Sequence, residues 1–246
     1  LNHFLLDCST IERYKSINLN MLVSIIITNY NYGNYLHRCI RSCLNQTLPI
    51  NEFEVILVDD FSKDNSHSVV EEYKSLPNFK YIRNKKNLGV AHSANTAIKK
   101  SKGKYFVRVD SDDYINKEFA NILSLYLEEN PKKLGVACDY YLINDKEKKI
   151  QQVSSKEKPI ACGIMYNKRK LLKEGLYNAN FKHREEEELR CRLGERYKIH
   201  NLSLPLYRYR MHLSNKTKSK DYLDKFKVKI NEIKKANFRN KIKRKF

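Results

Sequence analysis

Short continuous apolar runs, rich in β-branched and aromatic side chains, recur along this chain and are typical of strands buried on both faces. They lie at residues 22–28, 53–58, 79–83 and 105–109. Between them, apolar side chains recur every three or four positions, which predicts helices. The helical segments are residues 35–44, 66–73 and 91–100. This alternation predicts an α/β fold whose central sheet is mostly parallel and covered by helices on both faces.

The second half of the chain continues the alternation less regularly. Its segments are a helix at 116–130, a strand at 134–143, a polar surface connection at 150–159, an apolar pattern at 162–173, and a helix at 183–193 that begins with consecutive glutamates. We expect three regions, namely an N-terminal extension at 1–21, one domain at 22–215 and a basic helical extension at 216–246.

Polar side chains gather where three of the predicted strands end, at residues 28–31, 59–60 and 110–113. Parallel strands bring their carboxyl ends to one edge of a sheet, where ligands bind. Crowded carboxylates repel one another unless a cation neutralises them, and we expect no basic side chain beside Asp110, Asp112 and Asp113 to do so. Mg²⁺ and Mn²⁺ take such oxygen ligands and often share them with substrate phosphates. The alternative is a solvated acidic turn that caps the next helix.

The net charge of +20 implies an anionic partner, which could be nucleic acid, a membrane surface or a phosphorylated substrate. Residues 216–246 hold 13 Lys and Arg against 3 Asp and Glu, so this tail carries half of the excess. The six cysteines show no zinc-type spacing and favour buried thiols in a reducing compartment. No apolar stretch is long enough to cross a membrane, and we expect a cytoplasmic protein, peripheral on the inner face of the membrane.

Five ordered motifs resemble those of a known family. They read VSIIITNYNYGNYLHRCIRSCLNQT, EVILVDDFSKDNS, KNLGVAHSANTAI, GKYFVRVDSDDY, and FKHREEEELRCRL with PLYRYRMH. Together they resemble the family 2 glycosyltransferases, which have the GT-A fold. The resemblance implies a hexosyl- or N-acetylhexosaminyltransferase that moves a sugar with inversion from a nucleotide-diphosphate sugar, a UDP-sugar first, to a glycan or lipid-linked acceptor. The cofactor implied is Mn²⁺ or Mg²⁺.

The resemblance also assigns residues to the donor. Thr28 and Tyr30 would contact the nucleobase, with the ring of Tyr30 stacked on it. Asp60 would accept a hydrogen bond from the base NH. Three further residues would approach the nucleotide: Lys86, Asn87 and Gly89.

The metal assignments follow from the DxD motif Asp110-Ser111-Asp112. Asp112 would be the main metal ligand, Asp110 would bind the ribose or share the metal, and His212 would close the metal site. Arg208 or Arg210 would add positive charge near the diphosphate, or instead pair with the glutamates of the late acidic motif.

The late acidic motif usually reads Glu-Asp, and alignment on the leucine and arginine that follow it places the pair at Glu185-Glu186. The implied catalytic base is therefore Glu186, which would take the proton of the acceptor hydroxyl in a single displacement. Glu185 and Glu187 are the alternative assignments. Phe61 is a second departure, because many members have Gly at that position.

Three other functions fit parts of the sequence. A sugar nucleotidyltransferase would have a Gly-rich phosphate loop after the first strand, yet residues 29–34 contain one glycine. A nucleic-acid-binding protein would spread its basic residues over one face of the domain, whereas half of the excess lies in the tail. An inactive scaffold would not need the intact acidic motifs.

The tail has the pattern of an amphipathic helix. Apolar residues recur every three or four positions from Leu223 to Ile233 and every four from Phe238 to Phe246, and Lys and Arg fill most positions between them. Such a helix would lie in the interface of an anionic membrane. The alternative is a helix that packs its apolar stripe on the domain.

Overall fold

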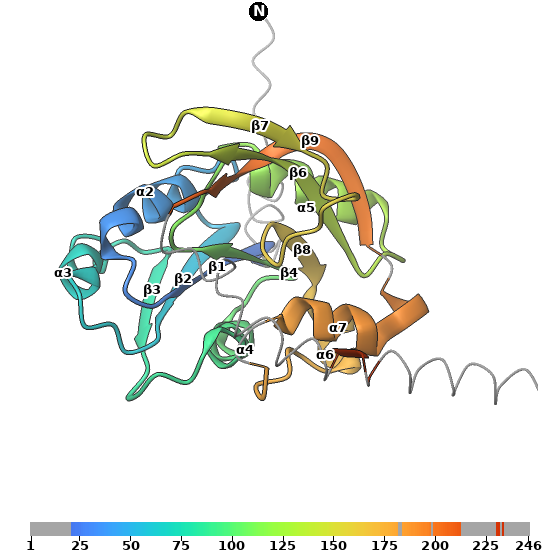
Figure 1. Cartoon of the computed structure of the whole chain (residues 1–246), viewed down its shortest axis with the longest axis horizontal. Helices are drawn as coiled ribbons and strands as arrows, with labels where there is room; N and C mark the ends of the chain where they lie inside the picture. Colours follow the sequence, from blue (N-terminus) through green and yellow to red (C-terminus); the bar gives the residue numbers. More distant parts are fainter. Residues whose placement is uncertain (1–20, 182–183, 198, 213–229, 232, 234–246) are drawn as a thin grey trace, which may run out of the picture.

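A computed structural model describes residues 21–181, 184–197, 199–212, 230–231 and 233 of the chain (Figure 1). The first half contains β1 (Val23–Asn29), α2 (Gly33–Leu44), β2 (Phe53–Asp59), α3 (Ser66–Glu71), β3 (Phe79–Arg83), α4 (Val90–Lys100) and β4 (Tyr105–Asp110). The second half contains β5 (Tyr114–Ile115), α5 (Phe119–Glu129), β6 (Gly135–Ile143), β7 (Lys149–Val153), β8 (Ile164–Asn167), α6 (Lys168–Glu174), α7 (Glu185–Leu193), the short 3-10 helix η1 (Gly194–Arg196) and β9 (Ile199–Arg210). The predicted α/β class is confirmed.

Within the described residues, the strands form one sheet in the order β3-β2-β1-β4-β8-β6-β9-β5, and β7 pairs with β6. The first four strands are parallel, and β6 is parallel to β9. In contrast, β8 runs antiparallel to β4 and β6, and β5 and β7 are antiparallel to their partners. The parallel sheet that the sequence predicts is therefore the half formed by β1 to β4, and the other half is mixed.

Helices cover both faces of the sheet, as predicted (Figure 1). Along β1, Ile25 and Ile27 belong to an apolar core that includes side chains of α2, α3 and α5. Ile26 belongs to a second core with side chains of α4, α6 and α7. Successive side chains of a strand point to opposite faces, which explains why a continuous β-branched run builds two cores at once.

Three boundaries differ from the sequence prediction. Strand β7 (Lys149–Val153) occupies the first part of the polar connection expected at 150–159. Its exposed residues resemble a loop in sequence because it is an edge strand. Helix α3 ends at Glu71 rather than at Tyr73. Helix α5 begins only at Phe119, because the residues immediately after the acidic cluster form β5.

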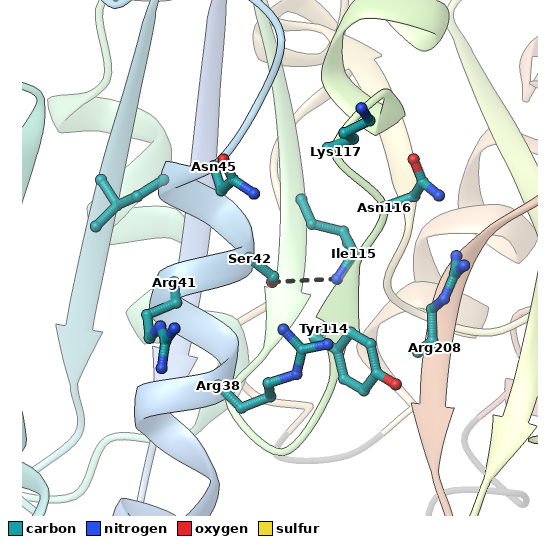
Figure 2. A pocket seen from close by; sticks show the side chains of 10 residues that line it. Arg38, Arg41, Ser42, Asn45, Tyr114, Ile115, Asn116, Lys117 and Arg208 are labelled. Carbon is teal, nitrogen blue, oxygen red and sulfur yellow. Dashed lines mark hydrogen bonds between the residues drawn. The ribbon is translucent and has the colours of Figure 1, made fainter. Parts of the chain in front are cut away.

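A recess lies between α2 and β9, with β5 as its floor (Figure 2). Its volume is about 600 Å³. The segments around the recess come from widely separated parts of the sequence, so no local sequence pattern predicts the recess.

No helix among the described residues is both long and apolar enough to cross a membrane. Most of the predicted tail helix lies outside the described residues. Ile230 is described, and it is 1% exposed in a small apolar cluster with Phe181. At this residue the tail packs on the domain, which is the alternative to membrane insertion.

Candidate functional site

The carboxyl ends of β1, β2 and β4 meet at one edge of the sheet, as the sequence predicts. Thr28 lies directly opposite Asp110 of β4, and Asn29 lies opposite Asp59 of β2. The three polar clusters are therefore neighbours because the strand register aligns them.

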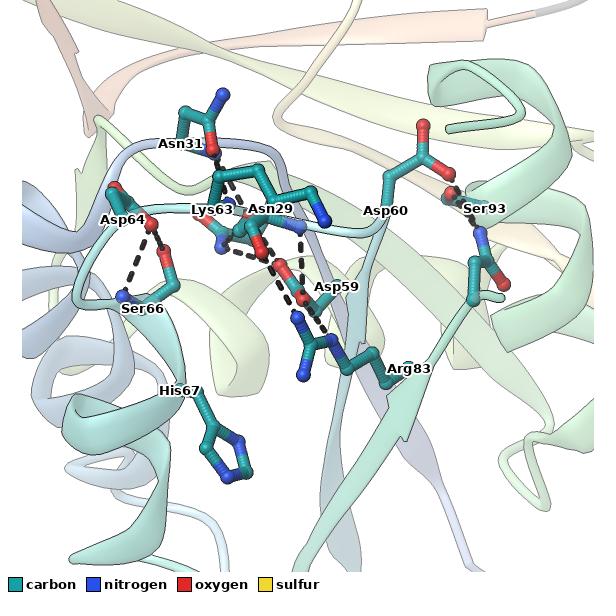
Figure 3. Close-up of polar contacts among 12 residues, drawn as sticks. Asn29, Asn31, Asp59, Asp60, Lys63, Asp64, Ser66, His67, Arg83 and Ser93 are labelled. Carbon is teal, nitrogen blue, oxygen red and sulfur yellow. Dashed lines mark hydrogen bonds and ion pairs between the residues drawn. The ribbon is translucent and has the colours of Figure 1, made fainter. Parts of the chain in front are cut away.

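Asp59 holds the turns after β1 and β2 together (Figure 3). Its buried carboxylate accepts hydrogen bonds from the side chain of Asn29 at 3.0 Å and from the backbone NH of Ser62 at 3.2 Å. Arg83 lies 3.4 Å away and balances its charge. These contacts give Asp59 a structural role. The next residue, Asp60, contacts a different loop.

Asp60 shapes the loop that carries the other predicted donor residues. Its carboxylate accepts hydrogen bonds from the backbone NH groups of Leu88 at 2.9 Å and Gly89 at 2.7 Å, and from the side chain of Asn84 at 2.8 Å. Gly89 has a φ of 90°, which favours glycine. The preceding Lys86 and Asn87 are exposed. The structure thus places Asp60, Lys86, Asn87 and Gly89 together, with Asp60 as the organiser of the loop.

The turn after β1 presents aromatic side chains beside the carboxylates. Tyr30 is half-buried immediately after the strand. Tyr32, to which sequence reasoning gave no role, lies close enough to the acidic cluster that burial, and then Asp112, Asp110 and Asp113, raise the pKa of its hydroxyl. A second aromatic in the same short turn was the sequence signal for it.

Phe61 has a φ of 70°, in the left-handed region that disfavours side chains. This conformation explains why glycine is common at this position in the resembled family. A cation–π contact offsets part of the strain at Phe61, because the ammonium group of Lys63 lies 3.8 Å from the ring centroid.

Asp113 is buried and links the end of β4 to β9. It accepts hydrogen bonds from the Tyr207 hydroxyl at 2.7 Å and from the backbone NH of Arg210 at 2.8 Å. The Tyr207 hydroxyl in turn accepts one from the backbone NH of Asp110 at 3.2 Å. Burial, followed by the charges of Asp112 and Asp110, raises the pKa of Asp113.

Asp112 meets His212, as the metal prediction requires. Its Oδ2 lies 2.9 Å from His212 Nε2, and the His212 side chain is 2% exposed. A carboxylate is a ligand type for both Mn²⁺ and Mg²⁺, whereas imidazole suits transition metals and so favours Mn²⁺ of the two. A carboxylate and an imidazole from segments 100 residues apart are thus brought to one point.

A second group of possible ligands lies beside it. Asp110, Asp113 and Cys162 place one ligand atom each within 4.8 Å of one another. However, Asp113 is already bonded to β9, and burial holds the pKa of the Cys162 thiol well above its usual range, which disfavours the thiolate that binds metal. Of this group, the resemblance assigns Asp110 to the metal.

Arg108 corrects the expectation that no basic side chain neutralises the cluster. Its guanidinium is 3% exposed and lies 3.2 Å from Asp110 Oδ1. The same guanidinium donates a hydrogen bond of 2.6 Å to Glu185, the first residue of α7. This Asp110–Arg108–Glu185 chain joins the DxD motif to the late acidic motif. In the sequence, Arg108 is one residue within an apolar run, and nothing there indicates that it pairs with two carboxylates.

Glu186 is the residue after Glu185, but its side chain faces a different environment from the Asp110–Arg108–Glu185 contacts. Its Oε1 accepts a hydrogen bond of 2.6 Å from the Tyr166 hydroxyl and another from Tyr197. Its Oε2 is buried and has no hydrogen-bond partner among the described residues. Burial raises the pKa of Glu186. Glu187, one of the alternatives, is ion-paired with Arg184 at 2.7 Å.

Arg210 does not pair with the glutamates of α7 in the contacts described. Its guanidinium donates to the Asp112 carbonyl at 2.8 Å and pairs with Glu147 at 3.1 Å. Arg208 donates to the Pro205 carbonyl at 2.9 Å and lines the recess between α2 and β9. Arg210 therefore stabilises the main chain of the DxD motif through its hydrogen bond to Asp112.

The sequence matches a known protein family over most of its length. The profile of Glycosyl transferase family 2 covers residues 24–195. The chain belongs to this family.

Relatives and solved structures within the family agree with this placement. The chain is 41% identical over 115 residues to the poly(ribitol-phosphate) beta-N-acetylglucosaminyltransferase TarP of Staphylococcus aureus, covering 46% of this chain and 35% of TarP. It is 37% identical over 132 residues to the chondroitin synthase of Escherichia coli, covering 52% of this chain and 18% of the synthase. The S. aureus TarS structure with UDP superposes with a TM-score of 0.67 at 25% identity, covering 78% of this chain and 61% of that one.

A fourth similarity concerns the fold alone. A mannosyltransferase of Pyrobaculum calidifontis, solved with GDP-Man and Mn²⁺, has a TM-score of 0.63 at 17% identity and covers 78% of this chain and 58% of its own. The chain spans about a third or less of the two curated relatives named above. Neither a sugar nucleotidyltransferase nor a nucleic-acid-binding protein finds support in this family membership.

Breaking the buried Arg108–Glu185 pair should be costly, because removal of one partner leaves a buried charge without compensation. We expect Arg108→Met to lower the free energy of unfolding by about 3–5 kcal/mol, measured in urea. Adding Glu185→Leu should recover part of this loss.

The exposed Lys104–Glu128 pair, at 2.7 Å just before β4, provides the control. Lys104→Met should cost roughly 1 kcal/mol or less. An equal, small loss in both single variants would contradict the structural role of the buried pair.

Proposed function

We propose that this domain is an inverting glycosyltransferase that moves a sugar from a nucleotide-diphosphate sugar to a glycan or lipid-linked acceptor. The observation that carries the proposal is the contact between Asp112 and His212, 2.9 Å apart, at the strand edge that also holds Thr28 and Asp60. A nucleobase site and a diphosphate site at one edge fit a nucleotide-sugar donor.

For the donor, the proposal is a UDP-sugar, because the S. aureus TarS structure at 25% identity is a complex with UDP. Thr28 and Tyr30 would contact the base, and Asp60 would accept a hydrogen bond from it. Asp60 Oδ2 accepts one hydrogen bond in the structure, from Gly89, and a carboxylate oxygen can accept two. Lys86 and Asn87, on the loop that Asp60 shapes, would approach the phosphates.

A divalent cation held by Asp112, Asp110 and His212 would supply positive charge where the diphosphate leaves. The side chains fit such an ion because all three offer oxygen or imidazole ligands and two of them are already in contact. Mn²⁺ or Mg²⁺ is the proposed cofactor. Asp110 is the side chain shared with Arg108, which limits the net negative charge of the site.

Glu186 is the proposed base. Burial raises its pKa, which makes the carboxylate a better proton acceptor at neutral pH than an ordinary glutamate. Tyr166 and Tyr197 orient Oε1, and Oε2 is the atom left to take the proton of the acceptor hydroxyl. Glu185 is less suited, because Arg108 neutralises it.

Asp112→Asn should abolish transfer and metal-dependent donor binding while the fold is retained. The amide loses the charge that holds a hard cation, yet its oxygen can still accept a hydrogen bond from His212. Transfer of radiolabelled sugar and calorimetric titration of UDP-sugars with Mn²⁺ measure the two effects. Near wild-type activity of this variant in Mn²⁺ would refute the metal assignment.

Glu186→Gln should lower kcat by about 10²-fold or more, with the dissociation constant of the donor nearly unchanged. In the wild-type chain, activity should fall as pH decreases through the raised pKa of Glu186, because only the ionised form accepts a proton. A larger loss in Glu185→Gln or Glu187→Gln than in Glu186→Gln would move the assignment to that residue.

The same variant also has an expected effect on stability. A raised carboxyl pKa means that the contribution of Glu186 to stability is present at low pH and is lost as pH rises through the folded-state pKa. Glu186→Gln should therefore keep or raise Tm at pH 8 relative to the wild type. A large decrease in Tm would show that the loss of kcat is structural.

The acceptor is proposed to be membrane-linked, and the basic tail would hold the domain at the inner face of the membrane. Each basic side chain near an anionic surface contributes roughly 1 kcal/mol. The full chain should co-sediment with anionic vesicles at low salt, detach as salt rises, and ignore neutral vesicles. Absence of binding at low salt would leave the tail with the packing role that Ile230 shows.

A further inference from the structure

The recess between α2 and β9 is lined by basic side chains from three elements. Arg38 and Arg41 come from α2, Lys117 follows β5, and Arg208 comes from β9 (Figure 2). No carboxylate is among the residues that line it in the described part of the chain. Four cations around about 600 Å³ are an arrangement that costs electrostatic energy in the absence of an anion.

These charges are poorly compensated by the protein itself. Arg38 pairs with Glu147 at 3.1 Å. For Arg41, Lys117 and Arg208, the described residues provide no ion-pair partner. Burial, together with the charge of Arg38, lowers the pKa of Arg208, so two guanidinium groups repel each other across the recess.

The floor of the recess follows the acidic cluster in the sequence. Tyr114, which forms part of its floor, is the residue after Asp113, and the Arg38 guanidinium lies 4.1 Å from the Tyr114 ring centroid. Helix α2 also carries Tyr35, whose ring centroid is 5.0 Å from that of His212. Helix α2 therefore carries one residue near His212 and two basic residues that line the recess.

We propose that this recess, which we call the basic groove, binds an anionic segment of the acceptor polymer, bearing phosphate or carboxylate groups. The inference rests on the proposed glycosyltransferase function and specifies the class of its acceptor. Guanidinium groups suit such anions because they donate two parallel hydrogen bonds to one phosphate or carboxylate. A recess with charges on both walls suits a polymer with repeated negative charges better than a single small anion.

The test measures binding of fluorescent polymers to the full chain by anisotropy. The probes are sodium polyphosphate, oligogalacturonate and neutral dextran. The Arg41→Gln/Lys117→Gln variant changes two exposed groove residues. Its affinity for at least one anionic probe should fall about tenfold, and the slope of log Kd against log salt should decrease by about one unit for each cationic side chain removed from the polymer's path.

The Lys99→Gln/Lys100→Gln variant is the matched control. These lysines are exposed at the end of α4, on the opposite face of the sheet, and the charge change is identical. Its affinity should remain at the wild-type value. The melting temperature of each variant shows whether it is folded.

The possible results distinguish the two sources of the anion. They also distinguish failure of the basic groove from failure of the proposed transferase function. Stronger binding of polyphosphate indicates a phosphodiester polymer, and stronger binding of oligogalacturonate indicates an acidic glycan. Equal losses in both variants, or no loss in the groove variant, would refute the groove, because the tail or the overall charge would then bind the polymers. Wild-type protein that binds polymer but no nucleotide-sugar, with or without Mn²⁺, would refute the transferase function and leave the groove intact.

Discussion

The site depends on one buried carboxylate, that of Asp113. It joins the end of β4 to β9 through the Tyr207 hydroxyl and the backbone of Arg210, and Tyr207 also holds the backbone NH of Asp110. These hydrogen bonds offset part of the cost of burying the carboxyl group. This link fixes the position of the DxD motif relative to the segment that carries His212.

Three carboxylates can remain close together because each of them has a different partner. Asp110 shares the charge of Arg108, a residue of its own strand, with Glu185. Asp112 contacts His212 after β9, and Asp113 is bonded to β9 itself. These partners reduce the electrostatic repulsion among the three carboxylates by a different amount at each carboxylate. Asp113 is bonded to β9, whereas Asp110 and Asp112 each lie beside one basic or titratable side chain.

Much of this arrangement could be predicted from local patterns. β-Branched runs locate β1, β2 and β4, and parallel pairing then brings the polar residues after them to one edge. Asp112 and His212 are in contact, and it was the resemblance to family members, not the spacing of 100 residues, that paired them in the sequence analysis; their role as metal ligands stays a prediction.

The remaining features could not be predicted, because they arise from pairings between distant segments. Arg108 looks like an interior strand residue, and its partner Glu185 is 77 residues away. Residues 149–153 look like a loop because an edge strand is exposed. The basic groove joins α2 to β9, and no sequence pattern places Arg41 opposite Arg208. In each case the sheet order decides which side chains meet.

The most direct test of this account is the position of a bound cation. Crystals of the full chain grown with MnCl₂ and UDP would locate Mn²⁺ by its anomalous scattering. The account predicts one peak about 2.1 Å from a carboxylate oxygen of Asp112, with His212 and the diphosphate as further ligands. A peak between Asp113 and Cys162, or UDP bound at this edge without any Mn²⁺ peak, would contradict it.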